Sequence, residues 1–335
     1  MRTAAPGVST RGELPIIADP GGIGGPVVTG GPVGIGEHHE SFPCFGGECR
    51  VIVAGGAEAR GAARMARTRL LEWHRQFSRF EADSELSRLN RDPRPTVPVT
   101  PLMRRILEAG VAAARRTGGL VDPTLVAEVE AAGYAAHLER PGAALAELLA
   151  RAPARTPAGA HPAAGWQAVD VDRRAGTVSR PPGLRFDSGG IAKGVFADEL
   201  ATLLSDHDAF VVDCGGDLRL GGRARVAREV HVASPFGDAV AHTFRLSGGG
   251  IATSGIGKRS WLTPDGRPAH HLIDPRAGAP AFTGIVQATA VAPTATEAEV
   301  LSKAAILSGP GRAERVLIGG GVIVFDDGSI SVIDP

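Results

Sequence analysis

Cysteine, aromatic residues and an excess of charge of one sign are all missing or scarce in this sequence of 335 residues. Acidic and basic side chains number 36 each, so no surplus of positive charge can neutralise nucleic-acid phosphates, and no nucleic-acid partner is expected. The three cysteines, Cys44, Cys49 and Cys214, lack the paired spacing of a zinc site, although a Cys44–Cys49 disulfide stays open. No apolar run is long enough to span a membrane. These absences leave a globular protein large enough for two domains or one elaborate domain.

Glycine and proline dominate the N-terminal region. Residues 20–36 contain too many of both to form the apolar helix of a secretory signal, and the same composition disfavours a packed core. We therefore predict a flexible leader over residues 1–38 and a folded region, which could consist of two intertwined halves, over residues 39–335. The protein is expected in the cytoplasm.

Apolar periodicity predicts the main elements. Residues recurring every three or four positions indicate helices ending near Phe77 and over residues 101–116, with further helix around 126–152, and they assign Trp73 and Phe77 to the core. The second half predicts helices over 191–205 and 295–308, and short strands over residues 166–171, 177–179, 209–213, 229–234, 242–246, 285–292, 321–325 and 329–333. Long helices mixed with meandering strands indicate an α+β fold. A nicotinamide dehydrogenase is disfavoured, because no Gly-x-Gly-x-x-Gly follows the first strand.

The segment Asp187–Gly194 combines a carboxylate, two adjacent glycines and a lysine where an extended segment gives way to a helix. Glycine lets the backbone approach a ligand closely, and the amides and dipole of a first helical turn favour an anion. Lys193 adds a movable cation, so a diphosphate would suit this place. Taken alone, the segment fits an ordinary strand-to-helix turn equally well, because short glycine motifs recur by chance.

Three other segments combine polar residues with glycine or proline. In Phe77–Asn90 a helix end runs into a loop, where Ser84 and Ser87 can cap the next turn, and a capped loop alone would explain this composition. Pro123 forces Asp122 out of the helical region, which presents its carboxylate at a bend. Residues 213–217 end a strand in a glycine pair between two aspartates, which suits the close approach of a ligand or of another backbone.

A fourth segment brings an imidazole, a carboxylate and a guanidinium close together in sequence. His271, Asp274 and Arg276 follow the Ile251–Gly255 segment, which contains Ser254. For His271 alone, a hydrogen-bonded structural histidine would be slightly favoured. So many polar groups in one turn instead indicate a shared partner and acid–base chemistry.

The order of these motifs resembles that of the FAD:protein FMN transferase (ApbE) family. The resemblance covers residues 42–310 and is specific, because five short motifs occur in the family's order. They are Ser84–Asn90, Val121–Thr124, Asp187–Gly194, Gly215–Asp217, and Ala252–Gly255 together with His271–Arg276. It implies an α+β fold of the T-fold-like kind, with mixed or antiparallel sheets, packed helices, and FAD in a cleft between two halves.

The resemblance also implies which residues contact FAD. They are Phe45, Val121, Asp122, Pro123, Asp187, Gly190, Lys193 and Ser254. Phe45 stands where the family usually has methionine, and an aromatic ring there can still stack on the ligand. Asp187, Gly190 and Lys193 are expected beside the diphosphate.

In the family a magnesium ion bridges the diphosphate, and one helix carries the pattern Ala-Asp-Ala-Leu-Ala-Thr. Here the aspartate corresponds to Glu299 and the threonine to Lys303. The implied metal contacts are Gly190, Glu299, Ser302 and Lys303. A protonated lysine cannot bind a metal, and positions 299 and 303 share a helix face, which suits an ion pair. We therefore expect Lys303, with Lys193, to supply charge to the diphosphate in place of magnesium or beside it.

The expected activity is transfer of FMN from FAD onto a threonine or serine hydroxyl of a target flavoprotein, with release of AMP. His271 would act as general base or position the hydroxyl, Asp274 would orient His271, and Arg276 would stabilise the phosphoryl charge. Hydrolysis of FAD to FMN and AMP, and FAD binding without catalysis, are the alternatives. Members of the family commonly act outside the cytoplasmic membrane, so its outer face is the alternative location.

Overall fold

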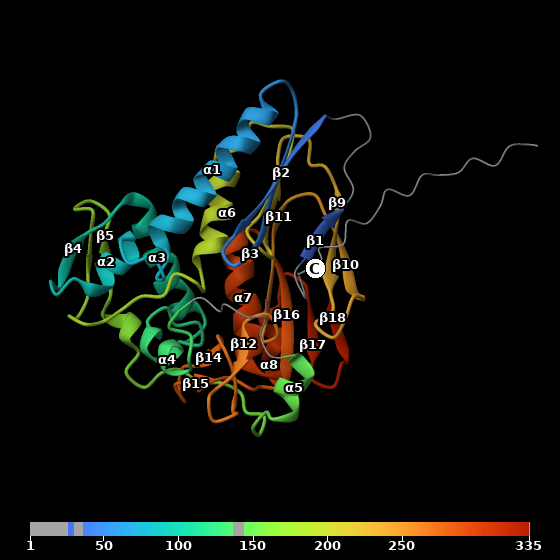
Figure 1. Cartoon of the computed structure of the whole chain (residues 1–335). Coiled ribbons are helices and arrows are strands. Elements are labelled where there is room, and N and C mark those ends of the chain that lie inside the picture. The colour runs from blue at the N-terminus through green and yellow to red at the C-terminus, as the bar shows by residue number, and fades with distance from the viewer. Residues whose placement is uncertain (1–25, 30–35, 137–143, 335) are drawn as a thin grey trace, which may run out of the picture.

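An eight-stranded antiparallel sheet forms the centre of the computed structural model, which describes residues 26–29, 36–136 and 144–334 (Figure 1). The predicted α+β class is thereby confirmed. In order across the sheet the strands are β18 (Ile330–Ile333), β17 (Gly321–Phe325), β16 (Ile285–Ala292), β11 (Gly249–Gly255), β8 (Asp217–Gly221), β7 (Ala209–Asp213), β3 (Gly47–Ala54) and β2 (Glu37–Cys44).

Both faces of this sheet are buried. Successive side chains of a strand point to opposite faces, and in β3 Val51 and Val53 belong to one apolar cluster while Ile52 belongs to a second. A layer of helices covers one face, and a three-stranded sheet packs on the second cluster. The helices are α1 (Ala59–Phe77), α6 (Ala192–Leu203) and α7 (Ala295–Ser308), and the strands are β1 (Pro26–Thr29), β9 (Arg228–Ala233) and β10 (Val240–Leu246).

A side lobe, seen at the left of Figure 1, lies beside the helical layer. It contains α2 (Glu85–Arg91), α3 (Pro101–Arg116), α4 (Val126–Ala131), the 3-10 turn η1 (Gly165–Ala168) and the strands β4 (Thr96–Pro98), β5 (Asp170–Asp172) and β6 (Thr177–Ser179). The remaining elements are α5 (Leu145–Ala150), α8 (Pro310–Val316) and the two-stranded pairs β12 (Ser260–Leu262) with β13 (Pro268–His270) and β14 (Ile273–Asp274) with β15 (Ala279–Pro280).

Three helices begin at side chains that cap them. The hydroxyls of Ser84, Thr100 and Thr294 accept hydrogen bonds from amides in the first turns of α2, α3 and α7. Such caps satisfy amides that have no partner within the helix. The predicted helices 101–116 and 295–308 are confirmed with the same bounds.

The N-terminal boundary differs from the prediction. Residues 26–29 form β1, which pairs with β9, and β2 begins at Glu37, so both strands start inside the predicted leader 1–38. Pairing with β9 supplies hydrogen bonds that the glycine-rich composition does not reveal. The rest of that leader, apart from residue 36, lies outside the described residues.

Other predicted elements are shorter or of another type. Residues 126–152 contain the short helices α4 and α5 instead of continuous helix, and the predicted strand 166–171 is mostly η1 followed by β5. Cys44, Cys49 and Cys214 are buried free thiols, so no Cys44–Cys49 disulfide forms.

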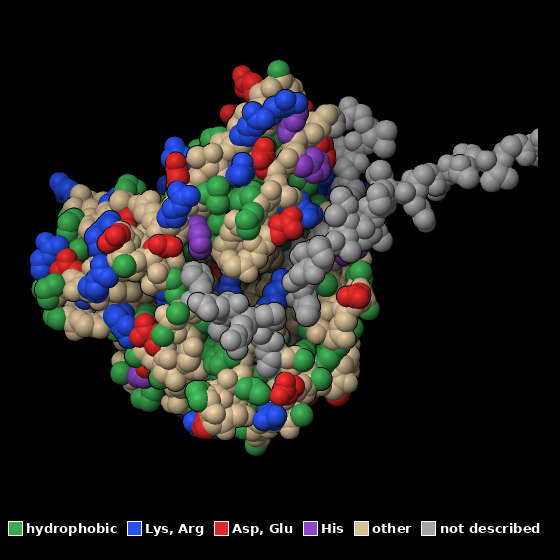
Figure 2. Space-filling view, viewed as in Figure 1, with side chains coloured by type: hydrophobic (Ala, Val, Ile, Leu, Met, Phe, Trp, Pro, Cys, Tyr) green, Lys and Arg blue, Asp and Glu red, His purple; other side chains and the backbone are tan. Residues whose placement is uncertain are grey.

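The surface carries charged side chains of both signs. On the face shown in Figure 2, acidic and basic side chains are interspersed over α1 and the side lobe. None of the helices within the described ranges is both long and apolar enough to cross a membrane.

Candidate active site

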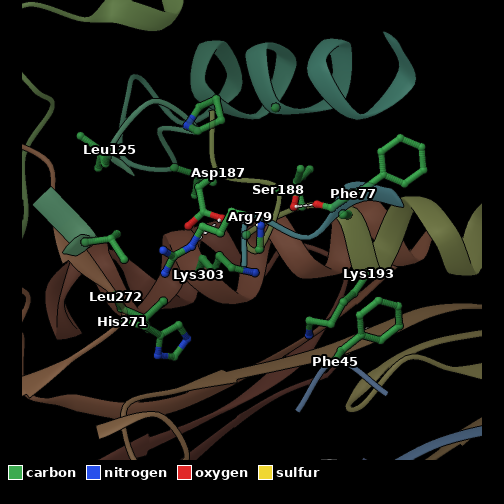
Figure 3. Close-up of a pocket in the computed structure, with 18 of the residues that line it drawn as sticks. Phe45, Phe77, Arg79, Leu125, Asp187, Ser188, Lys193, His271, Leu272 and Lys303 are labelled. Atoms are coloured by element: carbon green, nitrogen blue, oxygen red, sulfur yellow. Dashed lines mark hydrogen bonds and ion pairs between the residues drawn. The ribbon is translucent and has the colours of Figure 1, made fainter. Parts of the chain in front are cut away.

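A pocket of about 190 Å³ lies between the side lobe and the helical layer (Figure 3). Its walls come from segments far apart in sequence: the β2–β3 turn, the end of α1, α3, the bend after α3, the start of α6, the residues leading into β14, and α7. Nine predicted site residues line it, namely Phe45, Val121, Asp122, Pro123, Asp187, Gly190, Lys193, His271 and Lys303. The structure therefore brings most of the predicted site together.

Backbone hydrogen bonds join the motifs behind the pocket. The amide of Asp187 donates to the carbonyl of Pro123 at 2.8 Å, which fixes two predicted segments against each other. The side chain of Asn90 both donates to and accepts from the backbone of Phe186, each time at 2.8 Å. The Ser84–Asn90 motif thus holds the segment that leads to Asp187, and its residues do not line the pocket.

Aromatic rings form one wall. Phe45 stacks on Phe196 with ring centroids 5.8 Å apart, and Trp73 lies 5.4 Å from the same ring. Trp73 and Phe77, which the sequence assigns to the core alone, also line the pocket, because the last turns of α1 end at its edge. Such a wall suits a planar aromatic ligand.

Asp122 lines the pocket and has one carboxylate oxygen that is buried and unpaired among the described residues. Its Oδ1 accepts hydrogen bonds from the amide and the hydroxyl of Thr124 at 2.8 and 2.5 Å. Its Oδ2 is buried and has no hydrogen-bond partner among the described residues. Burial raises the pKa of this carboxyl, against the hydrogen bonds from Thr124. An acceptor left unpaired in a pocket can recognise a ring N–H of a ligand.

Cations gather at the α6–α7 side. Lys193, Arg259 and Lys303 line the same pocket as His271, and the charges of Arg259 and Lys303 act on its imidazole (Figure 3 labels the two lysines and the histidine). Lys193 pairs with Asp217, and the Nζ of Lys303 lies 2.9 Å from Glu299 Oε1. Burial lowers the pKa of Lys193, but the carboxylates of Asp217 and Glu299 more than offset this and leave the pKa above its ordinary value. Lys193 therefore stays charged at neutral pH.

The amides at the start of α6 are less available than the sequence predicts. The amide of Gly189 donates to Asp187 Oδ1 at 2.8 Å, and the amides of Ile191 and Ala192 donate to the carbonyl of Ser188. The amide of Gly194 donates to Glu299 Oε2 at 2.8 Å. The lysine and arginine side chains, more than the helix terminus, make this part of the pocket attractive to an anion.

His271 has an unpaired ring nitrogen. Its Nδ1 is buried and makes no hydrogen bond within the described part of the chain. Burial, and then the charge of Arg259, hold the pKa of this imidazole well below its ordinary range, so the ring is neutral at neutral pH. One nitrogen of a neutral imidazole can accept a proton. His271 is therefore in the protonation state that a general base requires, although the lowered pKa makes it a weaker base than an exposed histidine.

Asp274 and Arg276 do not share the pocket with His271, contrary to their predicted catalytic roles. Oδ1 of Asp274 accepts hydrogen bonds from the amides of Gly159 and Arg276 at 2.9 and 3.0 Å. The exposed guanidinium of Arg276 donates to the carbonyl of Pro157 at 2.9 Å. These polar groups satisfy one another and hold the loop around residue 158, which explains why they cluster in sequence.

Three further predicted contacts lie behind the pocket wall. Ser254, Glu299 and Ser302 are buried and do not line it. The hydroxyls of Ser254 and Ser302 share a hydrogen bond of 2.8 Å, because β11 packs directly against α7. In this arrangement the pocket wall separates these three side chains from the ligand space, contrary to their predicted contacts.

Two arginines of the pocket were not predicted. Arg259 Nη2 donates to the carbonyl of Phe45 at 2.8 Å and so holds a residue whose φ is 54°. Arg79 lies over the rings of Phe80 and Tyr134, with distances of 4.2 and 4.8 Å to their centroids, and 3.7 Å from Asp187. Arginine is too common in this sequence for either residue to stand out, although Arg79 shortly precedes the Ser84–Asn90 motif.

The residues expected to hold magnesium do not fit it. Mg²⁺ prefers six oxygen ligands, with carboxylates among them. One carboxylate oxygen of Glu299 is paired with Lys303 and the other with the amide of Gly194. Within the described ranges, no three histidine, cysteine, aspartate or glutamate side chains group in a way that could hold a metal ion.

The fold and the pocket define the class of protein: an antiparallel α+β protein whose pocket suits a ligand that is both aromatic and anionic. The model of the ApbE family matches residues 45–321, and the chain belongs to that family.

The chain is similar to known proteins of this family both in sequence and in fold. The chain is 30% identical over 289 residues to the FAD:protein FMN transferase of Klebsiella pneumoniae (strain 342), covering 82% of this chain and 80% of the relative. It is 29% identical over 300 residues to the enzyme of the same name from Treponema pallidum (strain Nichols), covering 84% and 81%. The crystal structure of the ApbE protein from Thermotoga maritima matches with a TM-score of 0.73 at 25% identity, over 89% of this chain and 97% of that one. The flavin transferase ApbE from Vibrio cholerae matches with a TM-score of 0.68 at 21% identity, over the same shares. The expected T-fold-like architecture is thereby confirmed.

Proposed function

We propose that this chain transfers the FMN half of FAD to a threonine or serine hydroxyl of a target flavoprotein and releases AMP. The observation that carries the proposal is neutral His271, which lines the same pocket as Lys193, Arg259 and Lys303. A base among cations is what the attack of a hydroxyl on a phosphorus atom requires. The relatives that bear the name FAD:protein FMN transferase support the same reaction.

Different residues of the pocket wall serve different steps of the reaction. The acceptor oxygen forms a bond to the phosphorus on the FMN side, and its proton passes to the imidazole of His271. The bond from that phosphorus to the AMP phosphate oxygen breaks, and AMP leaves with the electron pair. Lys193, Arg259 and Lys303 meet the negative charge on the diphosphate, while the aromatic wall holds a ring of FAD.

One incubation separates this function from its alternatives. The purified chain is mixed with FAD, with and without a flavoprotein that a related FMN transferase modifies. The amounts of AMP, free FMN and protein-bound flavin are then measured. AMP together with flavin bound to the acceptor supports the transferase. AMP with free FMN identifies FAD hydrolysis, and FAD binding without AMP identifies a binding protein.

The place of action is a second proposal. We propose a cytoplasmic location, and the outer face of the membrane is the alternative. Fractionation of cells that express the chain from its own gene, with detection by antibody, tests which of the two holds.

A further inference from the structure

Lys303 occupies the space next to the carboxylate that a divalent cation would need. Its Nζ lies 2.9 Å from Glu299 Oε1, and Glu299 is fully buried. A Cβ added at Gly190 would meet the Cε of Lys303 at 3.7 Å, so the lysine stem passes between Gly190 and Glu299. A cation bound to that carboxylate would have to displace the ammonium, which would repel it at close range.

A second lysine repeats the arrangement. Lys193 pairs with Asp217, whose side chain is 1% exposed. In both pairs the carboxylate lies behind the ammonium, and only the ammonium lines the pocket. Glu299 is fully buried, and its second carboxylate oxygen accepts a hydrogen bond from the amide of Gly194. The carboxylates therefore hold the ammoniums in place and are not available as metal ligands.

Lysine is rare in this chain. Among 36 basic side chains only three are lysines, Lys193, Lys258 and Lys303, and two of them face this pocket. An ammonium is a compact charge with three donors, whereas the guanidinium of arginine is a broad planar fork. The two pocket positions thus carry the basic residue closest in size to a metal ion.

We propose that the ammoniums of Lys303 and Lys193, and not a divalent cation, hold the diphosphate of FAD in this chain. The inference rests on the proposed function. Each ammonium uses one N–H for its carboxylate, as far as the described residues show, and so has two left for phosphate oxygens. When the bond to AMP breaks, the charge on the departing phosphate meets these donors, and no metal is needed to neutralise it.

The first test compares metal-free and metal-loaded conditions. The full-length chain is freed of metals with a chelator, and its Kd for FAD is measured by flavin fluorescence in chelator and in excess magnesium, together with AMP release. We expect both quantities to change by less than about twofold. A gain of about tenfold or more in affinity or rate on adding magnesium overturns the inference.

The second test removes the charge. Lys303→Met is expected to raise the Kd for FAD about tenfold and to slow AMP release about 10²–10³-fold, while Lys303→Arg keeps part of both. Lys258→Met is the matched control, because Lys258 is exposed and lies outside the pocket. If Lys303→Met has the same Kd for FAD and the same rate of AMP release as the unaltered chain, the inference is contradicted.

A double variant distinguishes loss of folding from loss of function. Lys303→Met leaves Glu299 buried without its lysine, so Glu299→Gln combined with Lys303→Met removes both charges and serves if the single variant does not fold. AMP release only in the presence of magnesium rejects the inference and leaves the proposed function standing. FAD binding that is equal in chelator and magnesium, without any AMP release, rejects the proposed function and supports only the binding part of the inference, that the ammoniums hold the diphosphate.

Discussion

His271 illustrates at the scale of one residue how burial keeps a histidine neutral. Its ring is neutral because its surroundings disfavour the imidazolium, which lowers the pKa, and its Nδ1 has no partner in the described residues. We expect His271→Ala to bind FAD about as well as the unaltered chain and to lose about 10²–10⁴-fold in the rate of FMN transfer. Flavin fluorescence measures the binding and AMP release measures the transfer. An unchanged transfer rate would show that another group takes the proton.

Substitutions of Arg259 and Arg276 test whether Arg259, which lines the pocket, acts in catalysis in place of Arg276, which does not line it. Arg259→Ala removes a cation of the pocket and the hydrogen bond to Phe45, so transfer is expected to slow about 10²-fold. Arg276→Ala removes one hydrogen bond to Pro157, which costs about 1 kcal/mol of unfolding free energy and leaves the transfer rate nearly unchanged. AMP release and urea unfolding of both variants are the measurements, and the reverse order of rates would restore Arg276 to the site.

At the scale of elements, the contact between α6 and α7 supports the site. Gly194 lies in the first turn of α6, and a Cβ there would come within 2.6 Å of the Cα of Thr296. Only glycine lets the two helices approach so closely, and this approach brings Glu299 to the amide of Gly194 and Lys303 to the pocket.

Gly194→Ala should therefore destabilise the fold. Because backbone atoms of α7 cannot move aside as a side chain could, the expected cost is about 1–3 kcal/mol of unfolding free energy. Gly61→Ala in α1 is the control, since a Cβ added at Gly61 would meet no atom within 4 Å, and alanine should stabilise that helix by about 0.5–1 kcal/mol. Urea unfolding of both variants decides the question, and equal effects would disprove the close contact.

At the scale of the whole molecule, buried histidine makes stability depend on pH. His270 is fully buried, and burial lowers its pKa from 6.5 to about 3. The folded chain therefore keeps the ring neutral, while the unfolded chain takes up a proton below about pH 6.5. Stability from this group is complete above that pH and is lost as the pH falls toward about 3.

His270→Asn isolates this contribution. Between pH 7.5 and 5.5 the unaltered chain should lose about 1.4 kcal/mol of unfolding free energy relative to the variant. The buried aspartates are common to both chains, so their effects cancel in the difference. Urea unfolding at the two pH values provides the measurement, and parallel pH profiles would refute the assignment.

Regular periodicity made the helices 101–116 and 295–308 predictable, because each begins at a capping threonine and buries one apolar face or more. Strand β11 (Gly249–Gly255) escaped prediction, because its glycines and hydroxyls lack the apolar alternation of a strand. It is nevertheless central in the sheet, where Gly250 allows close contact with Thr294. Its register with β8 and β16 depends on residues far away in sequence.

The sequence alone determined the set of motifs, the family that they resemble, and nine residues that line the pocket, because those properties are carried by short local patterns. Only the tertiary structure decided which polar groups face the ligand space. Asp274 and Arg276 are used to hold a loop, and Arg259 replaces them beside His271. Only the tertiary structure also decided which cation faces the diphosphate, because the packing of α6 on α7 sets the position of Lys303 between Gly190 and Glu299. Contacts between distant segments are fixed by packing, and local spacing does not encode them.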